Sequence, residues 1–232
     1  MRLFGRPLEL LILDVDGVIL QVESFVAQNM KAVARKLGLP LDRIDEHFLN
    51  IKFGREPAQG SLRAGIKYLW PFLSEEDINK FFFLSREERW GNPWPAIPGS
   101  IETINWFRRQ NVTLAICTAN DRLTLDNQFL AAGVDLAWFA AFSVLESEYR
   151  KPHPRALDGI FELTGFSRNH AIYVGDWQAD IDVARGAGVR FFGTLSGGMP
   201  REFFARQGVP EDHIIDRLSD LMLLVLNHNW LF

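Results

Sequence analysis

The chain has 232 residues, of which 47% are hydrophobic and 23% charged, with a formal net charge of -4. This length accommodates one large domain, or a core domain that carries a smaller inserted one. The acidic balance argues against general nucleic-acid binding, which needs a basic face. The single cysteine excludes an internal disulfide framework and is typical of a reducing compartment.

The first apolar run, Leu10–Leu13, has the length of a strand and ends in two carboxylates one residue apart. Burying Asp14 and Asp16 at a strand end costs free energy unless a cation or a reaction needs them there. Gly17 follows them and lets the backbone turn close to a bound group. The run is too short to span a bilayer and lacks the cleavage site of a secretory signal. We therefore expect a cytoplasmic protein with no membrane partner.

Residues 20–96 show helical patterns only. The predicted helices are Ser24–Leu37, Leu41–Asn50, Ser61–Leu69 and Ser74–Arg89. Ser74 is the expected N-cap of the last one, with Asp77 at the third helical position. Proline and glycine between residues 92 and 99 indicate a return path to the core. The pattern predicts a helical module, residues 20–96, inserted into a core formed by residues 1–19 and 97–232.

From about Pro98 onward, strand-like and helix-like segments alternate. The predicted strands are Thr113–Cys117, Phe142–Leu145, Ala171–Val174, Arg190–Gly193 and His213–Ile215. The predicted helices are Leu123–Ala132, Pro154–Thr164, Gln178–Gly186, Pro200–Gln207 and Leu218–Leu226. This rhythm predicts an α/β fold: a Rossmann-like, doubly wound parallel sheet with helices on both faces.

Polar residues follow the later strands just as the two carboxylates follow the first. Thr118 ends one strand, and Asp176 ends another, with Asp180 four residues further on. Lys151 stands alone before Pro152. Ligands of open parallel sheets bind beyond the carboxyl ends of the strands, so we expect these side chains to converge on one edge. The helical module leaves the core at the same edge, where it would cover the site as a lid. Together these residues predict a reaction centre for phosphate.

These motifs resemble those of the haloacid dehalogenase superfamily, in its phosphatase branch with a helical cap. The resemblance covers nearly the whole chain and extends to members of the phosphoglycolate phosphatase and β-phosphoglucomutase types. It rests on four motifs in order: Asp14-Val15-Asp16-Gly17, Thr118 with Asn120, Lys151-Pro152, and Gly175-Asp176 with Asp180. It implies a Mg²⁺-dependent phosphomonoester hydrolase that acts on a small phosphorylated metabolite through an aspartyl-phosphate.

The resemblance also implies roles for individual residues. Asp14 would be the nucleophile and Asp16 the general acid and base, with Thr118 and Lys151 completing the catalytic set. The residues expected to bind the phosphate group or substrate are Gly17, Thr118, Ala119, Asn120, Lys151 and Arg55. The residues expected at the metal are Asp14, Asp16 through its carbonyl oxygen, Asp176 and Asp180. For Asp180 we favour orienting Lys151 or a metal-bound water over direct ligation.

Several alternatives stay open at this point. A phosphosugar mutase of the β-phosphoglucomutase type would share the motifs, and a non-catalytic phosphate-binding protein could share the fold. Asp16 disfavours a dehalogenase, because that reaction has no leaving alkoxide to protonate. The aromatic residues of the inserted module fit a small helical core better than a substrate cavity. The sequence leaves open whether the protein is a monomer or a homodimer, and it predicts that the C-terminal residues 221–226 and 230–232 dock on the core.

Overall fold

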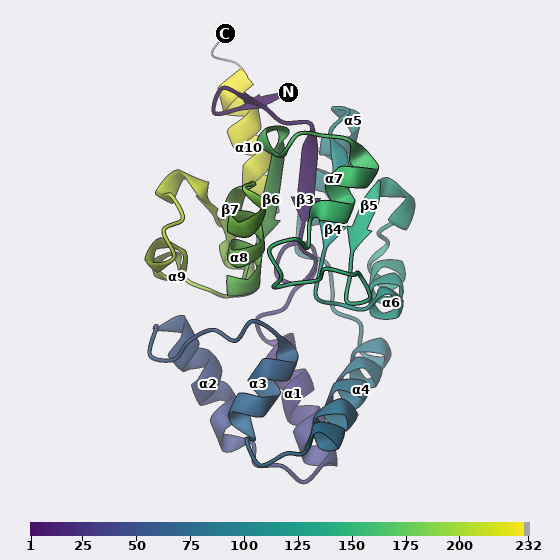
Figure 1. The fold of residues 1–232 in the computed structure, drawn as a ribbon, viewed down its shortest axis with the longest axis vertical. Helices are drawn as coiled ribbons and strands as arrows, with labels where there is room; N and C mark the ends of the chain where they lie inside the picture. The colour runs from purple at the N-terminus through teal and green to yellow at the C-terminus, as the bar shows by residue number, and fades with distance from the viewer. Residues whose placement is uncertain (230–232) are drawn as a thin grey trace.

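A computed structural model describes residues 1–229 as a sheet-and-helix core joined to a separate cluster of four helices (Figure 1). The core occupies the upper part of that view and the helical cluster lies beneath it. The docking predicted for residues 230–232 lies outside the described residues. No helix within residues 1–229 is long and apolar enough to cross a membrane.

The core sheet has six strands in the order β5-β4-β3-β6-β7-β8, and every neighbouring pair is parallel. Its strands are β3 (Leu10–Leu13), β4 (Thr113–Cys117), β5 (Ala141–Ser143), β6 (Ala171–Gly175), β7 (Arg190–Thr194) and β8 (Ile214–Ile215). The chain runs outward from β3 to β5 and then returns to place β6 on the other side of β3. The predicted doubly wound parallel sheet is therefore confirmed, with its topological switch point between β3 and β6.

Strand β3 shows why both faces of the sheet are covered. Its four residues are fully buried, and successive side chains point to opposite faces. Leu11 and Leu13 belong to one apolar cluster, and Leu10 and Ile12 belong to another. A strand that is buried on both sides reads as a continuous apolar run, which is the pattern that predicted it.

Helices cover the two faces of this sheet. The core helices are α5 (Ser100–Arg109), α6 (Arg122–Ala132), α7 (Asp158–Thr164), α8 (Gln178–Ala187), α9 (Arg201–Arg206) and α10 (Leu218–Asn229). Short 3-10 turns lie at Leu136–Trp138, Arg168–His170, Leu195–Gly197 and Glu211–His213. Leu221 and Val225 of α10 are buried in the same cluster as Leu11, which confirms the predicted docking of this part of the C-terminal helix.

Helix α5 and a two-stranded hairpin escaped the sequence prediction. Helix α5 follows the predicted return path of residues 92–99, in a stretch for which we predicted no element, although its buried residues follow a helical spacing. A two-stranded hairpin, β1 (Arg2–Leu3) and β2 (Arg6–Pro7), precedes the sheet. Its turn places Phe4 and Gly5 at positive φ, at 51° and 73°, and such a turn is hard to recognise when its first residue is not Asn, Asp or Gly. Helix α7 begins at Asp158, four residues after the predicted start at Pro154.

The lower cluster is formed by α1 (Phe25–Lys36), α2 (Asp42–Lys52), α3 (Leu62–Leu69) and α4 (Glu75–Gly91). It has its own apolar core, which contains Met30, Trp70 and Phe81. Helix α4 starts with the expected capping box, in which the Ser74 hydroxyl accepts from the backbone N–H of Asp77 and the Asp77 carboxylate accepts from that of Ser74. Of the aromatic residues of this cluster, Trp70 and Phe81 are buried in its core, whereas Phe53, Phe72 and Phe83 are exposed.

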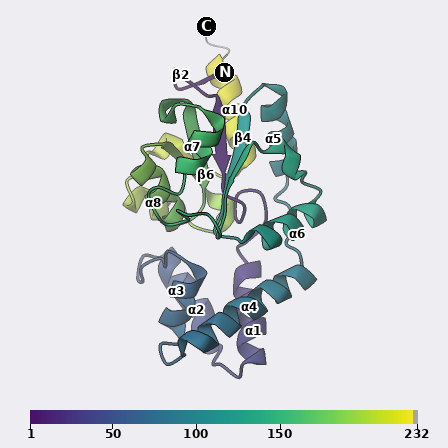
Figure 2. The same ribbon diagram turned by 45° about the vertical axis from the view of Figure 1, so that its right-hand side comes forward.

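The two connections between the helical cluster and the core run side by side. Residues 19–21 pair with residues 95–97: the backbone N–H of Gln21 donates to the carbonyl of Pro95 at 2.9 Å, and that of Ile97 to Ile19 at 2.8 Å. Helix α4 also reaches α6 of the core (Figure 2). Arg86 forms an ion pair with Asp121 at 2.8 Å there. The helical cluster is therefore attached to the core at the carboxyl edge of the sheet.

Candidate active site

Asp14 lies directly after β3 and is held between the neighbouring strand and a lysine. Its backbone N–H donates to the carbonyl of Val174 at 2.9 Å, which continues the pairing of β3 with β6. Its carboxylate lies 2.8 Å from Nζ of Lys151. Both side chains are at least 90% buried. The ion pair therefore stands in a low-dielectric environment, where charges interact strongly.

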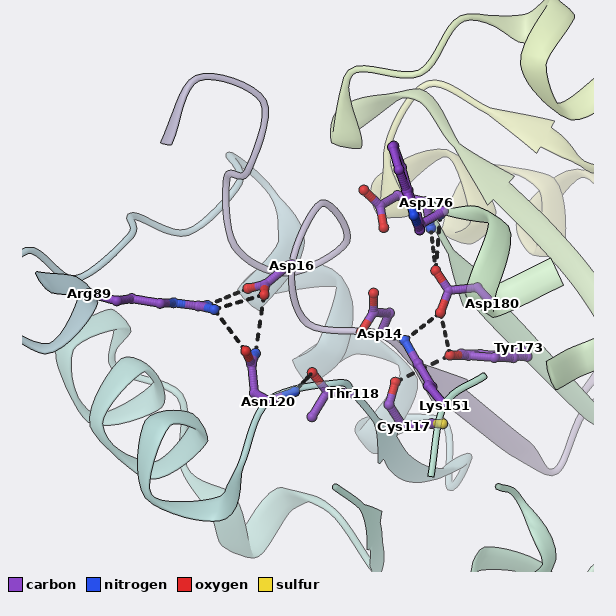
Figure 3. A network of polar contacts seen from close by, with 11 residues as sticks. Asp14, Asp16, Arg89, Cys117, Thr118, Asn120, Lys151, Tyr173, Asp176 and Asp180 are labelled. Atoms are coloured by element: carbon purple, nitrogen blue, oxygen red, sulfur yellow. Dashed lines mark hydrogen bonds and ion pairs between the residues drawn. The ribbon is translucent and has the colours of Figure 1, made fainter. Parts of the chain in front are cut away.

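Asp180, in the first turn of α8, has both of its carboxylate oxygens occupied by donors (Figure 3). Oδ1 accepts from Nζ of Lys151 and from the Tyr173 hydroxyl. Oδ2 accepts from the backbone N–H groups of Asp176 and Trp177, at 3.1 and 3.0 Å. Such a carboxylate fixes the position of the lysine and of the loop that follows β6.

Asp176 presents a buried carboxylate of a different kind. No donor within residues 1–229 is hydrogen-bonded to its side chain, although the residue is only 6% exposed. Ligand oxygens of Asp14, Asp176 and Asp180 lie within 4.8 Å of one another. Gly17 and Gly197 both face the Asp176 side chain so closely that a Cβ at either position would collide with it. Clustered buried carboxylate oxygens are the ligands that a hard divalent cation uses, and those of Asp176 are not occupied by a donor among the described residues, so the residues fit such an ion.

Burial, and after it the proximity of these acids to one another, changes their protonation. Burial, reinforced by the charge of Asp180 and opposed by Lys151, raises the pKa of Asp14 to about 7. Burial and the charge of Asp14 likewise raise the pKa of Asp176 well above its usual value. Burial on its own would lower the pKa of Lys151, but Asp14 and Asp180 outweigh it and raise that pKa. The lysine is therefore positively charged at any physiological pH, whereas the acids resist full ionisation.

Asp16 lies on the other side of Asp14 from Asp180, and its side chain is directed to the helical cluster (Figure 3). Arg89 of α4 binds it with both terminal nitrogens, and Nη1 lies 2.8 Å from Oδ2. The same Nη1 donates to Oδ1 of Asn120 at 2.8 Å, and Asn120 Nδ2 donates to Asp16 at 3.2 Å. The Arg89 guanidinium also lies 3.8 Å above the ring of Trp94. One arginine of the inserted module thus holds the second carboxylate of the first motif.

Sequence analysis overlooked Arg89 and Tyr173, although a signal for each was present. The buried residues of α4 are Ile78, Phe81, Ser85 and Arg89, so helical spacing places this arginine on the apolar stripe. A charged residue on a buried stripe needs a partner. A tyrosine in a buried strand also needs a hydrogen-bond partner for its hydroxyl, and the Tyr173 hydroxyl donates to Asp180.

A cavity of about 930 Å³ opens between the core and the inserted helices. Among the residues expected to bind phosphate or catalyse its transfer, the cavity lining includes Asp14, Asp16, Thr118, Ala119 and Lys151. Its lining from the inserted helices comes from α1, α2 and α3, and from the loop before α3.

Three expected residues are not among those that line this cavity: Gly17, Asn120 and Arg55. Asn120 is turned toward Asp16, and Gly17 is tied to the loop after β7 through its carbonyl, which accepts from the Ser196 hydroxyl at 2.6 Å. Arg55, which we expected to bind substrate, does not line the cavity: this residue is exposed, and its guanidinium lies 5.4 Å from the Phe53 ring. The chain turns at Phe53–Gly54 after α2, which carries Arg55 away from the cavity, whereas Lys52 lines it.

The sequence also matches characterised families and structures. The family model described as haloacid dehalogenase-like hydrolase matches residues 11–194. A phosphoglycolate phosphatase of Agrobacterium fabrum is 28% identical over 201 residues, which cover 83% of each chain. One of Mesorhizobium japonicum is 37% identical over 94 residues, so the chain matches only 40% of the length of that relative.

Solved structures show the same fold. The structure of CbbY from Rhodobacter sphaeroides in complex with phosphate has a TM-score of 0.71 at 15% identity, covering 92% of this chain and 96% of that one. A hydrolase from Pseudomonas syringae also has a TM-score of 0.71, at 19% identity and with 94% of this chain covered and 96% of that one. The family model spans most of the chain, from the strand that precedes Asp14 to the end of β7. The chain therefore belongs to the haloacid dehalogenase-like hydrolase family.

Proposed function

We propose that this protein is a phosphomonoester hydrolase that uses Mg²⁺ and acts on a small phosphorylated metabolite through an aspartyl-phosphate. The observation that carries the proposal is the buried pairing of Asp14 with Lys151, next to the unpartnered carboxylate of Asp176 and at the floor of a cavity. The phosphatases among the relatives support the same class of reaction. The single cysteine favours a reducing compartment, and we place the activity in the cytoplasm.

In the first half-reaction, an Asp14 carboxylate oxygen would attack phosphorus and form an O–P bond, while the bond from phosphorus to the alcohol oxygen breaks. Asp16 would donate a proton to that leaving oxygen, and would then take a proton from the water that hydrolyses the aspartyl-phosphate. Lys151 would offset negative charge on Asp14 and on the transferring phosphoryl group. The Thr118 hydroxyl, at the end of β4 and on the cavity wall, would donate to a phosphate oxygen.

Asp14 and Asp176 are the residues we assign to the metal ion, together with the backbone carbonyl of Asp16. We assign to Asp180 the role of orienting Lys151, because each of its two carboxylate oxygens already accepts from two donors. When bound, Mg²⁺ neutralises charge so that a carboxylate can approach an anionic phosphate. Residues 20–96 would act as the cap that closes the site against water, on the core of residues 1–19 and 97–232.

The effect of Mg²⁺ on thermal stability should depend on pH. Because the folded-state pKa of Asp14 is about 7, above its ordinary value of 3.8, the folded protein binds more protons than the unfolded chain between these values. Stability without metal should therefore fall as the pH rises through this range. A bound cation would offset the free-energy cost of ionising Asp14 in the folded protein. Saturating Mg²⁺ should therefore raise Tm by about 5–10 °C at pH 8 and much less at pH 5.

Calorimetry in Mg²⁺ and in chelator, at both pH values, would check this expectation. Asp176→Asn supplies the control, since it removes a proposed ligand and should abolish the metal-dependent shift at both pH values. Equal shifts at pH 5 and pH 8 in the unmodified protein would contradict the placement of the cation beside Asp14.

The second prediction concerns the positioning of Asp16 by Arg89. A lysine at this position keeps the charge but cannot bind both Asp16 oxygens in a fork. Because general acid–base catalysis contributes about 10²–10⁴-fold, we expect Arg89→Lys to lower kcat by about 10–100-fold with little change in KM. The pH profile of kcat should shift as well, which a purely structural defect would not cause.

The matched control is Arg86→Lys, one turn earlier on α4, where the arginine pairs with Asp121 rather than with Asp16. Steady-state kinetics should show near-normal kcat for this variant. If both variants lose the same activity, α4 acts through packing alone and Arg89 does not position Asp16.

Release of inorganic phosphate from a panel of phosphorylated metabolites, with Mg²⁺ and with chelator, tests the proposed reaction directly. We expect Mg²⁺-dependent release from at least one phosphomonoester. A requirement for a sugar bisphosphate without net phosphate release would instead indicate a phosphosugar mutase. Phosphate binding with no turnover on any compound would indicate a binding protein.

A further inference from the structure

We propose that the alcohol portion of the substrate is uncharged and largely apolar, and that it occupies the part of the cavity between α1, α2 and α3. This inference rests on the proposed hydrolase function and names the substrate class of the same site. It follows from three features of the cavity: the side chains on its cap wall, the ion pairs of its cations, and a glycine inside α3.

The surface of the cavity as a whole is more apolar than polar. From the inserted helices it includes Phe25, Val26, Ala27, Met30, Phe48, Leu49, Ile51 and Leu62, which alternate with polar residues such as Gln28 and His47. Trp177 and Met199 add apolar surface from the core. The volume of about 930 Å³ is near the upper end of the range for small-molecule sites. A phosphate group with two carbon atoms attached would leave most of this apolar surface in contact with water.

The cations that the inserted helices bring to the cavity are already paired. Lys31 lies 2.5 Å from Asp45, and Lys52 lies 2.9 Å from Glu23. All four of these residues line the cavity. Lys151 is paired with Asp14 and Asp180 at the floor. His47 on the same wall is bound to Glu56, with Nδ1 2.6 Å from Oε2. Among the lysines and arginines that line the cavity within residues 1–229, this leaves Arg217, which is exposed in the loop between β8 and α10 on the core side.

A second anionic group on the substrate would therefore meet poor conditions at the cap wall. It would have to displace Asp45 or Glu23 from its lysine, or enter an apolar environment unpaired, and both cost free energy. A two-carbon ester with a carboxylate, such as phosphoglycolate, carries such a group. An uncharged apolar group instead gains from leaving water.

Gly65 provides an independent observation. It lies inside α3, is buried and lines the cavity, yet a Cβ at this position would have no atom within 4 Å. Glycine is among the least favourable residues in a helix interior, and here no neighbouring side chain requires it. The missing side chain leaves open space on the cavity wall, which is where a bulky alcohol portion would fit.

The test measures hydrolysis of three alkyl phosphates by the purified protein in the presence of Mg²⁺. The three are methyl phosphate, 2-phenylethyl phosphate and phosphoglycolate. All three release an alcohol rather than a phenol, so that differences in kcat/KM report on binding of the alcohol portion. We expect kcat/KM for 2-phenylethyl phosphate to exceed that for each of the other two by about tenfold or more.

Two variants sharpen the comparison. Gly65→Leu fills the open space, and should lower the ratio of kcat/KM for 2-phenylethyl phosphate to that for methyl phosphate by about tenfold. Gly65→Ala should lower it less and shows whether the helix still folds. Gly159→Leu is the matched control, because this glycine lies in α7 outside the cavity and a Cβ there also meets nothing within 4 Å. It should leave the ratio unchanged.

A third variant tests the charges. Glu23→Gln frees Lys52 at the cavity wall and should raise kcat/KM for phosphoglycolate relative to 2-phenylethyl phosphate. Preference of the unmodified protein for phosphoglycolate, or a ratio that Gly65→Leu leaves unchanged, would overturn the inference while the hydrolase function stands. Absence of Mg²⁺-dependent phosphate release from every ester would overturn the proposed function itself, and the inference with it.

Discussion

Replacing Asp14 with asparagine should lower kcat for phosphate release by about 10⁴-fold or more, because an amide cannot form the aspartyl-phosphate. The fold should survive this change. Burial raises the pKa of Asp14 to about 7, so ionisation of this carboxyl opposes folding at higher pH. A neutral asparagine avoids that cost, and Lys151 keeps Asp180 as its ion-pair partner, so Tm in chelator at pH 8 should stay the same or rise.

Steady-state phosphate release and calorimetry on the same preparation would separate the two effects. Asp182→Asn is a suitable control, because this acid lies on α8 near the site and, within residues 1–229, its side chain accepts a hydrogen bond only from Gln178. It should keep normal turnover. If Asp14→Asn retained more than about a tenth of the activity, the nucleophile would have to be another residue.

Replacing Lys151 with methionine should damage both activity and stability. The lysine is the positive partner of two buried acids, Asp14 and Asp180. Removing one member of a buried ion pair typically costs about 3–5 kcal/mol, because an uncompensated charge stays behind. For a protein of this size that corresponds to a fall in Tm of about 10 °C. Turnover should be lost as well, because the transferring phosphoryl group loses its cation.

The double variant Lys151→Met with Asp180→Asn tests the electrostatic origin of this loss. It removes one of the two acids that the lysine compensates, so part of the lost stability should return while turnover stays low. Thermal unfolding at pH 7.5 measures both variants. A double variant that is less stable than Lys151→Met alone would show that packing of the lysine stem, rather than charge, sets its contribution.

The sheet and the placement of its polar residues were predictable because the physics is local. An apolar run of strand length is a strong signal, and a polar residue directly after it marks the strand's carboxyl end. Parallel pairing then brings such ends together: Leu13 pairs with both Ile116 and Val174, and Asp14, Thr118 and Asp176 follow nearby on the three strands. Cys117, the last residue of the predicted strand Thr113–Cys117, is buried, and burial raises the pKa of its thiol to about 11.

The contacts that depend on how two parts of the chain meet were harder to predict. Arg89 and Asp16 are 73 residues apart in the sequence, and no local pattern around either residue indicates that the two form a pair. The misplaced Arg55 shows the same difficulty, because one turn after α2 decides which cation faces the cavity. Helix α5 was overlooked for another reason. Its first residues follow Pro98 and Gly99, and Ile101, Thr103 and Ile104 are weak helix formers. The low helix propensity of this stretch therefore argued against a helix, although the spacing of its buried residues is helical.

The attachment of the inserted helices is uneven, and this sets a direction of movement. At one side, α4 is fixed to the core by Arg89, by Arg86 and by the Trp90 indole, which donates to Thr124 at 3.1 Å. At the other, the Trp177 indole donates to the carbonyl of Gln59 at 2.8 Å, Arg206 donates to the carbonyl of Lys52, and Ile51 packs in one apolar cluster with Met199 and Phe203 of the core. Because the charged contacts lie on the side of α4, we expect the inserted helices to pivot there, and substrate to enter at the rim of α2 and α3. Amide hydrogen exchange should then be faster around residues 52–61 than around residues 86–97.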